Sequence, residues 1–300
     1  MHFKFLFLFL PAISLFLLGC GPKDPKSDAE SGLSSIVIAL EPDKDPDAMI
    51  ADRESLEGFL SQAAGLKTEA IVPLSSTVIN EGLKNGTIDV AYLSSTATAR
   101  LMRSGAVEIL LASKVDGETS YLSYWLALKE KPYASIQDLA GKRIAFSSRT
   151  STSGFLIPSW DLYKQGLITL ETGPEGFFGE GNVYYGVGYV SAAERVLNGS
   201  AEAAAVSYYV LEQDKHLSLE QRAQLKVVDT QGPVPSHVIV VRASLSPEAK
   251  AKLREAFLSM NDEGVELRDR IFGGPLVAVD ADTHLAVTFE ALEVIEQMEF

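Results

Sequence analysis

A run of hydroxyl-bearing residues is the part of this sequence best suited to chemistry. Ser151, Thr152, Ser153 and Gly154 follow a predicted strand, residues 144–146, and precede a predicted helix. Side-chain hydroxyls, unpaired backbone N–H groups and the positive end of a helix dipole meet at such a turn. A phosphate-like anion needs these donors, but a serine-rich turn also serves as a purely structural helix N-cap. From these residues alone both interpretations remain open.

Other polar turns follow predicted strands in the same way. Ser94 and Ser95 come after one strand, and the pair Tyr208 and Tyr209 comes after another. Ligands of open α/β sheets lie beyond the carboxyl ends of the strands, so we expect these turns to face one cleft. Tyr121 lies on a further predicted strand, where its ring either lines the cleft or packs in the core.

The elements that position these turns alternate between strand and helix. Short apolar runs bounded by turn residues recur with amphipathic helices between them, which predicts an α/β fold of parallel sheets covered by helices. The chain contains two such series of alternating strands and helices, joined by two extended segments. This pattern predicts two lobes with a ligand cleft between them. Residues 35–126 and 234–300 are assigned to the first lobe, and residues 127–233 to the second.

Composition excludes several classes of protein. The net charge of −14 argues against a nucleic-acid partner, which would need a basic face. The chain has a single cysteine, and its four histidines lack metal-ligand spacing, so we expect no metal and no cofactor. Ser151 has no evident histidine or acid partner, so we expect no enzyme.

The N-terminus has the pattern of an export signal. Residues 1–20 join one cation to an apolar run that is too short to span a membrane comfortably. The sequence Leu17-Leu18-Gly19-Cys20 resembles a bacterial lipobox, which predicts lipidation of Cys20, although Leu18 is bulky for the motif. Residues 21–34 are polar and rich in Pro, Ser and Gly, a composition that predicts a flexible tether. The alternative is a signal that is cut elsewhere, with Cys20 incidental.

The stretch from Asp116 to Pro158 closely resembles the phosphate/phosphite/phosphonate-binding proteins of ABC importers. Three motifs carry the resemblance: Lys131-Pro132-Tyr133, Asp138-Leu139-Ala140-Gly141-Lys142-Arg143 and Ser151-Thr152-Ser153-Gly154-Phe155-Leu156-Ile157-Pro158. Weaker similarity covers most of the mature chain. The resemblance implies a two-lobed type II periplasmic binding protein fold that closes on its ligand, with the turn 151–154 as an oxyanion clamp.

Four positions depart from the family pattern. Tyr189 stands where the family carries a ligand-facing histidine, and Tyr208 and Tyr209 stand where it often has carboxylates. His237 lies where some members have Gly-Asp-Pro, and it is the histidine that we expect in the cleft. The missing carboxylates would have suited an ammonium group, so we expect aminoalkylphosphonates to bind poorly.

Together these features predict a lipid-anchored solute-binding component of an ABC importer. It would capture a small phosphate-, phosphite- or phosphonate-type oxyanion by lobe closure, as a monomer held by lipid on Cys20 at the bacterial cell envelope. Its partners would be an ABC permease and its ATPase. A ligand-sensing lipoprotein of the same fold, signalling to a membrane receptor, is the alternative. The expected ligand-binding residues are Ser94, Ser95, Tyr121, Ser151, Thr152, Ser153, Gly154, Tyr189, Tyr208, Tyr209 and His237.

Overall fold

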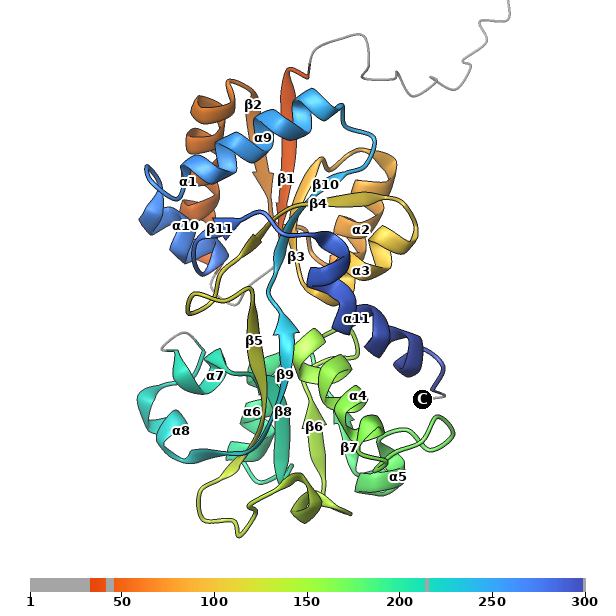
Figure 1. Cartoon of the computed structure of the whole chain (residues 1–300). Coiled ribbons are helices and arrows are strands. Elements are labelled where there is room, and N and C mark those ends of the chain that lie inside the picture. Colours follow the sequence, from red (N-terminus) through yellow and green to blue (C-terminus); the bar gives the residue numbers. More distant parts are fainter. Residues whose placement is uncertain (1–32, 42–45, 214–215, 299–300) are drawn as a thin grey trace, which may run out of the picture. The chain divides into compact units, whose positions relative to one another are not determined.

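The described part of the chain forms two β-sheets, each covered by helices (Figure 1). The computed structural model describes residues 33–41, 46–213 and 216–298, and both sheets belong to one compact unit that begins at Leu33. Cys20, the predicted lipidation site, lies outside the described residues.

The first sheet has six strands in the order β11-β4-β10-β3-β1-β2. Strands β1, β2 and β3 are parallel, whereas β10 runs antiparallel between β3 and β4. The strands are β1 (Ser35–Leu40), β2 (Lys67–Ile71), β3 (Val90–Leu93), β4 (Val107–Ser113), β10 (Val238–Arg242) and β11 (Leu276–Val277). Most of their side chains are buried because helices cover both faces.

Helices pack on the two faces of this sheet through separate apolar clusters. Leu60, Phe257 and Phe272 contribute to one cluster, and Ile79 and Leu101 contribute to the other. The helices of the first face are α1 (Pro46–Ala64), α9 (Pro247–Ser259) and α10 (Val265–Phe272), and those of the second are α2 (Ser76–Asn85) and α3 (Ser95–Arg103). The α3 N-terminus therefore lies at the carboxyl end of β3.

The second sheet has five strands in the order β7-β6-β8-β5-β9. Its strands are β5 (Ser120–Leu128), β6 (Ile144–Phe146), β7 (Val183–Tyr185), β8 (Ala203–Ser207) and β9 (Leu225–Pro235). Its short helices are η1 (Ile136–Leu139), η2 (Thr152–Leu156), α4 (Ile157–Lys164), α5 (Glu175–Phe178), α6 (Tyr189–Leu197), α7 (Tyr209–Glu212) and α8 (Leu219–Ala223). Trp125 lies at the centre of its core, with its ring centroid 5.4 Å from those of both Phe146 and Phe178.

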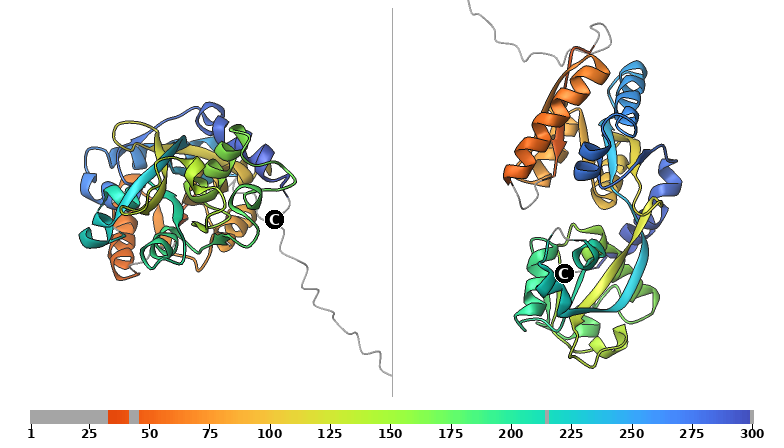
Figure 2. Two further views of the ribbon diagram at one scale, coloured as in Figure 1. Left: turned by 90° about the horizontal axis from the view of Figure 1, so that it is seen from below. Right: turned by 90° about the vertical axis from the view of Figure 1, so that its left-hand side faces the viewer.

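Two neighbouring segments connect the sheets (Figure 2). Residues 114–119 lead from β4 to β5, and Ser236 and His237 lead from β9 back to β10. Ser236 joins these segments, because its backbone N–H donates to Thr119 O at 3.0 Å and its Oγ donates to Ser113 O at 2.5 Å.

The C-terminal helix α11 (Ala281–Ile295) packs beside α3, α4 and β9 (Figure 1). The sequence-based division assigned residues 234–300 to the first lobe, whereas Leu285 and Leu292 of α11 lie in the core of the second sheet. The predicted boundary between residues 126 and 127 falls inside β5, and the boundary between residues 233 and 234 falls inside β9.

Candidate ligand-binding site

The serine turn after β6 is an N-cap. Ser151 has an extended backbone, and its Oγ accepts a hydrogen bond from the Gly154 N–H at 2.9 Å. The chain then makes the π-helical turn η2 and continues directly into α4, where Pro158 fits the first turn. Such π-helical turns are frequent at functional sites. Ser151 therefore has the structural capping role. The cap does not use the hydroxyls of Thr152 and Ser153, which have other partners.

Gly154 is required by the close approach of its neighbours. A Cβ atom at this position would lie 2.4 Å from the side chain of Ser147 and 2.8 Å from Ser151 Oγ. Ser147 cannot easily move away, because its Oγ donates to Ala205 O at 2.8 Å and its N–H donates to Gly154 O at 3.0 Å. The turn is thus fixed against the carboxyl end of the second sheet.

Four of the predicted hydroxyls meet in one cluster. Tyr189 OH lies 2.9 Å from Ser153 Oγ and 3.1 Å from Ser151 Oγ. Tyr121 OH lies 3.4 Å from Ser153 Oγ, and the hydroxyl of Ser123 donates to Ser153 O at 2.6 Å. Since the phenols come from β5 and α6 and the serines from the turn, three distant segments direct donors to one point.

The phenols of this cluster are protonated at neutral pH. Burial raises the pKa of Tyr121 well above its usual value, and burial also raises the pKa of Tyr189 against the opposing effect of its hydrogen bonds to Ser151 and Ser153. A neutral phenol remains a hydrogen-bond donor, so the cluster offers O–H groups without a net charge.

Thr152 points toward a different partner. Its Oγ1 lies 2.8 Å from Thr96 Oγ1 and 3.2 Å from both Thr96 N and Ser95 Oγ. Ser94 caps α3, accepting a hydrogen bond from the Ala97 N–H at 3.4 Å. Thr152 therefore ties the turn of the second sheet to the N-terminus of α3 from the first. Sequence reasoning missed Thr96, although it follows Ser94 and Ser95 directly.

Tyr208, Tyr209 and His237 line a cavity of about 470 Å³ with Tyr121. The Tyr208 ring lies 5.7 Å from the Tyr121 ring and 5.9 Å from the Tyr209 ring. Tyr209 in turn lies 5.4 Å from Tyr189, so the tyrosines form one continuous group. The remaining lining residues are Asp52, Tyr92, Ser113, Val115, Gln213, Asp269, Arg270, Ile271, Phe272 and Gly273.

Glu41 is a carboxylate that sequence reasoning missed. It follows β1 directly, beside the carboxyl end of β3. Burial raises its pKa from 4.5 to about 7. Its charge adds to burial in raising the pKa of both Tyr92 and Tyr189, which places Glu41 near these phenols. The position after a strand is the signal that could have identified it.

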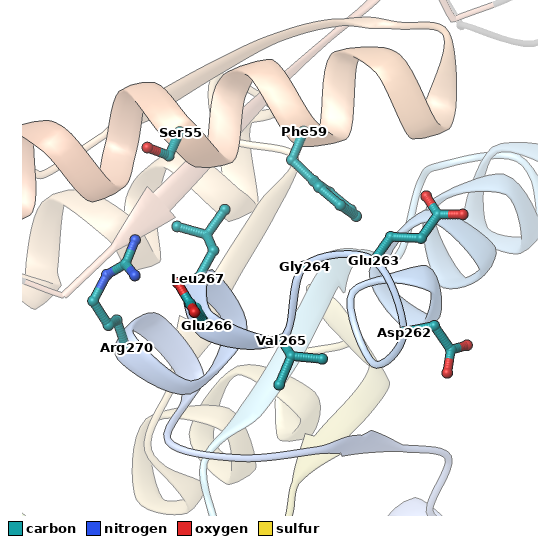
Figure 3. Close-up of a pocket in the computed structure, with 9 residues that line it drawn as sticks. All are labelled: Ser55, Phe59, Asp262, Glu263, Gly264, Val265, Glu266, Leu267 and Arg270. Carbon is teal, nitrogen blue, oxygen red and sulfur yellow. The ribbon is translucent and has the colours of Figure 1, made fainter.

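A second hollow, of about 620 Å³, lies between α1 and α10, two helices that cover the first sheet (Figure 3). Phe59 of α1 faces the connection between α9 and α10, which carries Asp262 and Glu263 (Figure 3). None of the predicted site residues line it. The cavity with the tyrosines is smaller, but it joins the hydroxyl cluster through Tyr121 and is the better candidate for ligand binding.

Neither a metal cluster nor a membrane-spanning helix is found among the described residues. In this part of the chain, no group of three or more histidine, cysteine, aspartate or glutamate side chains is placed to hold a metal ion. Across the same ranges, no helix has both the length and the apolar character needed to span a bilayer.

Known proteins share this architecture. The family described as periplasmic substrate-binding proteins of phosphonate ABC transporters matches residues 38–284. The phosphate-import protein PhnD of Mycolicibacterium smegmatis is 25% identical over 252 residues, covering 82% of this chain and 78% of that protein.

Two solved structures are similar to the whole arrangement. XAC2383 from Xanthomonas citri bound to ATP has a TM-score of 0.75 and 18% identity, with 89% of this chain and 100% of that chain covered. PhnD1 from Prochlorococcus marinus in complex with methylphosphonate has a TM-score of 0.74 and 14% identity, with 88% and 99% covered.

The fold is that of a type II periplasmic binding protein, as the family resemblance implied. The chain belongs to the periplasmic substrate-binding proteins of phosphonate ABC transporters, since that family matches more than half of its length. Such a protein is exported and binds a substrate for transport. It is not an enzyme, which confirms the expectation drawn from Ser151.

Proposed function

We propose that this protein holds a phosphate-, phosphite- or phosphonate-type oxyanion on Ser151 and Ser153, with Tyr121 and Tyr189 as further donors. The observation that carries the proposal is the convergence of Tyr189 OH on both serine hydroxyls, at 3.1 and 2.9 Å. In the structure these hydroxyls bond to one another. An anion would replace those bonds with charge-assisted ones, which are shorter and stronger.

Neutral donors explain how an acidic chain binds an anion. The net charge of −14 repels anions at long range, so the affinity must come from local groups. The donors of the cluster are partly or fully buried, and hydrogen bonds in such a low-dielectric setting are stronger than in water. The positive end of the helix that begins at Thr152 adds to them.

We propose that closure of two lobes completes the site. Ser94 and Ser95 lie at the N-terminus of α3, and Thr152 already bonds to this terminus from the second sheet. The two connecting segments, joined by Ser236, form the hinge in this scheme. The Gly154 N–H holds Ser151 Oγ in place at 2.9 Å, and Tyr208, Tyr209 and His237 surround whatever the anion carries.

Lipid on Cys20 would hold the domain at the bacterial envelope as a monomer, where it passes ligand to an ABC permease and its ATPase. The support is the signal and lipobox pattern of residues 1–20 and the polar tether that follows. The names of the relatives support the choice of ligand, since one is a phosphate-import protein and another was solved with methylphosphonate.

A thermal-shift panel tests the proposal. The panel contains phosphate, phosphite, methylphosphonate, 2-aminoethylphosphonate, sulfate and a sulfonate. A ligand at 100 times its Kd stabilises the fold by about 2.7 kcal/mol. We expect a clear shift with at least one phosphorus oxyanion, and its loss in the double variant Ser151→Ala/Ser153→Ala.

Ser148→Ala is the matched control, because Ser148 lies in the same turn but bonds to Thr150 at 3.2 Å instead of to the cluster. It should leave the shift unchanged. If no oxyanion shifts the melting temperature, or if the double variant responds like the wild type, the proposal is wrong.

A further inference from the structure

We propose that the ligand is an organic phosphonate or phosphate whose substituent carries an aromatic ring, with the ring held in the tyrosine-lined cavity. The inference rests on the proposed function, because it takes the hydroxyl cluster as the site of the anion. It adds the class of substituent, which the cluster itself does not determine.

The tyrosine-lined cavity adjoins the hydroxyl cluster that is proposed to bind the anion. Tyr121 belongs to both, since its hydroxyl lies 3.4 Å from Ser153 Oγ and its side chain also lines the cavity. Tyr208 and Tyr209 continue the lining from Tyr121, with ring centroids 5.7 and 5.9 Å apart along the series. A ligand whose anion lies at Ser153 would therefore extend its substituent into this space.

The cavity is far larger than an inorganic anion requires. Its volume of about 470 Å³ equals that of roughly sixteen water molecules at ~30 Å³ each. A tetrahedral oxyanion has about five heavy atoms and replaces only a few of these waters. Pockets of about 300–1,000 Å³ are typical of sites for larger organic ligands.

Two of the lining phenols have hydrogen bonds within the protein. Tyr92 OH donates to Phe272 O at 2.9 Å and lies 2.9 Å from Ser113 Oγ. Tyr208 OH accepts a hydrogen bond from Gln213 Nε2 at 3.2 Å. The Tyr92 hydroxyl is thus engaged as a donor, whereas Tyr208 keeps its own O–H. The faces of both rings are apolar, and they suit a planar ring better than a polyhydroxylated group.

The charged lining residues are paired with each other or with neighbours. Arg270 Nε donates to Asp52 Oδ1 at 2.8 Å, and Arg268 Nη2 donates to Asp269 Oδ1 at 2.7 Å. Both carboxylates of the lining therefore already have an arginine partner. Among the described residues that line the cavity, this leaves aromatic and neutral polar groups to meet the substituent.

Isothermal titration calorimetry with a graded series tests the inference. The probes are phosphate, methylphosphonate, n-propylphosphonate, phenylphosphonate and 2-aminoethylphosphonate. We expect phenylphosphonate to bind at least about tenfold more tightly than methylphosphonate, because its ring is buried against aromatic faces.

Variants locate the ring. Tyr208→Ala should lower the ratio of phenylphosphonate affinity to methylphosphonate affinity from at least about tenfold to near one, because it removes an aromatic wall of the cavity. If Tyr208→Ala does not fold, Gln213→Trp is the second variant. Gln213 is exposed and lines the cavity, so a tryptophan there should narrow the cavity and remove the preference for phenylphosphonate. Tyr184→Ala is the control, since Tyr184 is a half-buried tyrosine outside the cavity.

The outcomes separate the inference from the proposed function. Binding of methylphosphonate or phosphate as tightly as phenylphosphonate overturns the inference and leaves the anion site standing. Preference for 2-aminoethylphosphonate over phenylphosphonate also overturns it and would identify an amine as the substituent. Binding of none of the probes contradicts the proposed function itself.

Discussion

The hydroxyl of Tyr189 lies 2.9 Å from Ser153 Oγ. Tyr189 is the first residue of α6 and Ser153 is the second residue of η2, so two helices that start at the carboxyl edge of the second sheet each direct one side chain of their first turn to the same point. In this arrangement the phenol occupies a position where a ligand-facing histidine was expected from the family resemblance. It supplies a donor that does not titrate near neutral pH.

Tyr189→Phe should weaken oxyanion binding by at least about tenfold, because a hydrogen bond to a charged group contributes about 1.5–3 kcal/mol. The ring remains, so its packing against Tyr209 is kept. Calorimetric titration with whichever oxyanion binds best measures the change, with Tyr184→Phe as the control. Equal affinity in the variant and the wild type would show that the phenol does not contact the ligand.

Gly154→Ala should lower the free energy of unfolding by about 1–3 kcal/mol, since the new methyl group would be forced into Ser147. Gly58→Ala is the matched control. Gly58 lies within α1, and a methyl group there would meet no atom within 4 Å, so its replacement should stabilise by about 0.5–1 kcal/mol. Urea denaturation measures both, and a neutral Gly154→Ala would mean that the turn has room to adjust.

Thr152→Val should destabilise the fold by about 1–3 kcal/mol. The substitution keeps the shape but removes the oxygen that bonds to Ser95 and Thr96, and it leaves the buried Thr96 N–H without this partner. Thr150→Val, on the exposed side of the same turn, should stay within about 0.5 kcal/mol of the wild type. Comparable losses in both variants would argue against a specific tie between the turn and α3.

Glu41 should make stability depend on pH. Its pKa is about 7 in the folded protein against 4.5 for the ordinary group, so between these values the folded state keeps a proton that the unfolded chain releases. The stabilisation is present below pH 4.5 and is lost as the pH rises through 7. Its size is at most ~3 kcal/mol and smaller where solvent screens the carboxyl.

Denaturation midpoints measured between about pH 5 and 8 test the Glu41 prediction. Glu41→Gln should remove this part of the decline in stability, and Glu54→Gln, on the exposed face of α1, should not. The same slope in all three proteins would show that Glu41 titrates at its ordinary pKa.

The strands and the serine turn could be predicted from the sequence because their signals are local. The run 144–146 is apolar and short, and the hydroxyls of residues 151–153 follow it closely. The apolar runs 88–93 and 121–129 predict strands whose bounds differ from those of β3 and β5 by only one or two residues. Local patterning also placed Ser94 and Tyr208 at the ends of strands.

Contacts between distant segments were not accessible in the same way. The sequence of α11 shows an amphipathic helix, but not that Leu285 and Leu292 pack in the core of the second sheet. The bond between Thr152 and Thr96 and the position of Glu41 near Tyr189 also depend on how segments meet in three dimensions. Contacts of this kind leave no repeating pattern in the sequence, so they could not be predicted from the residues alone.

The most direct test of the central claim is a crystal structure of the protein with the oxyanion that binds best. We expect anion oxygens within hydrogen-bond distance of Ser151 Oγ, Ser153 Oγ and Tyr189 OH. An anion bound elsewhere, for example beside Phe59 in the hollow of Figure 3, with the serine and tyrosine hydroxyls still bonded to one another, would contradict the claim.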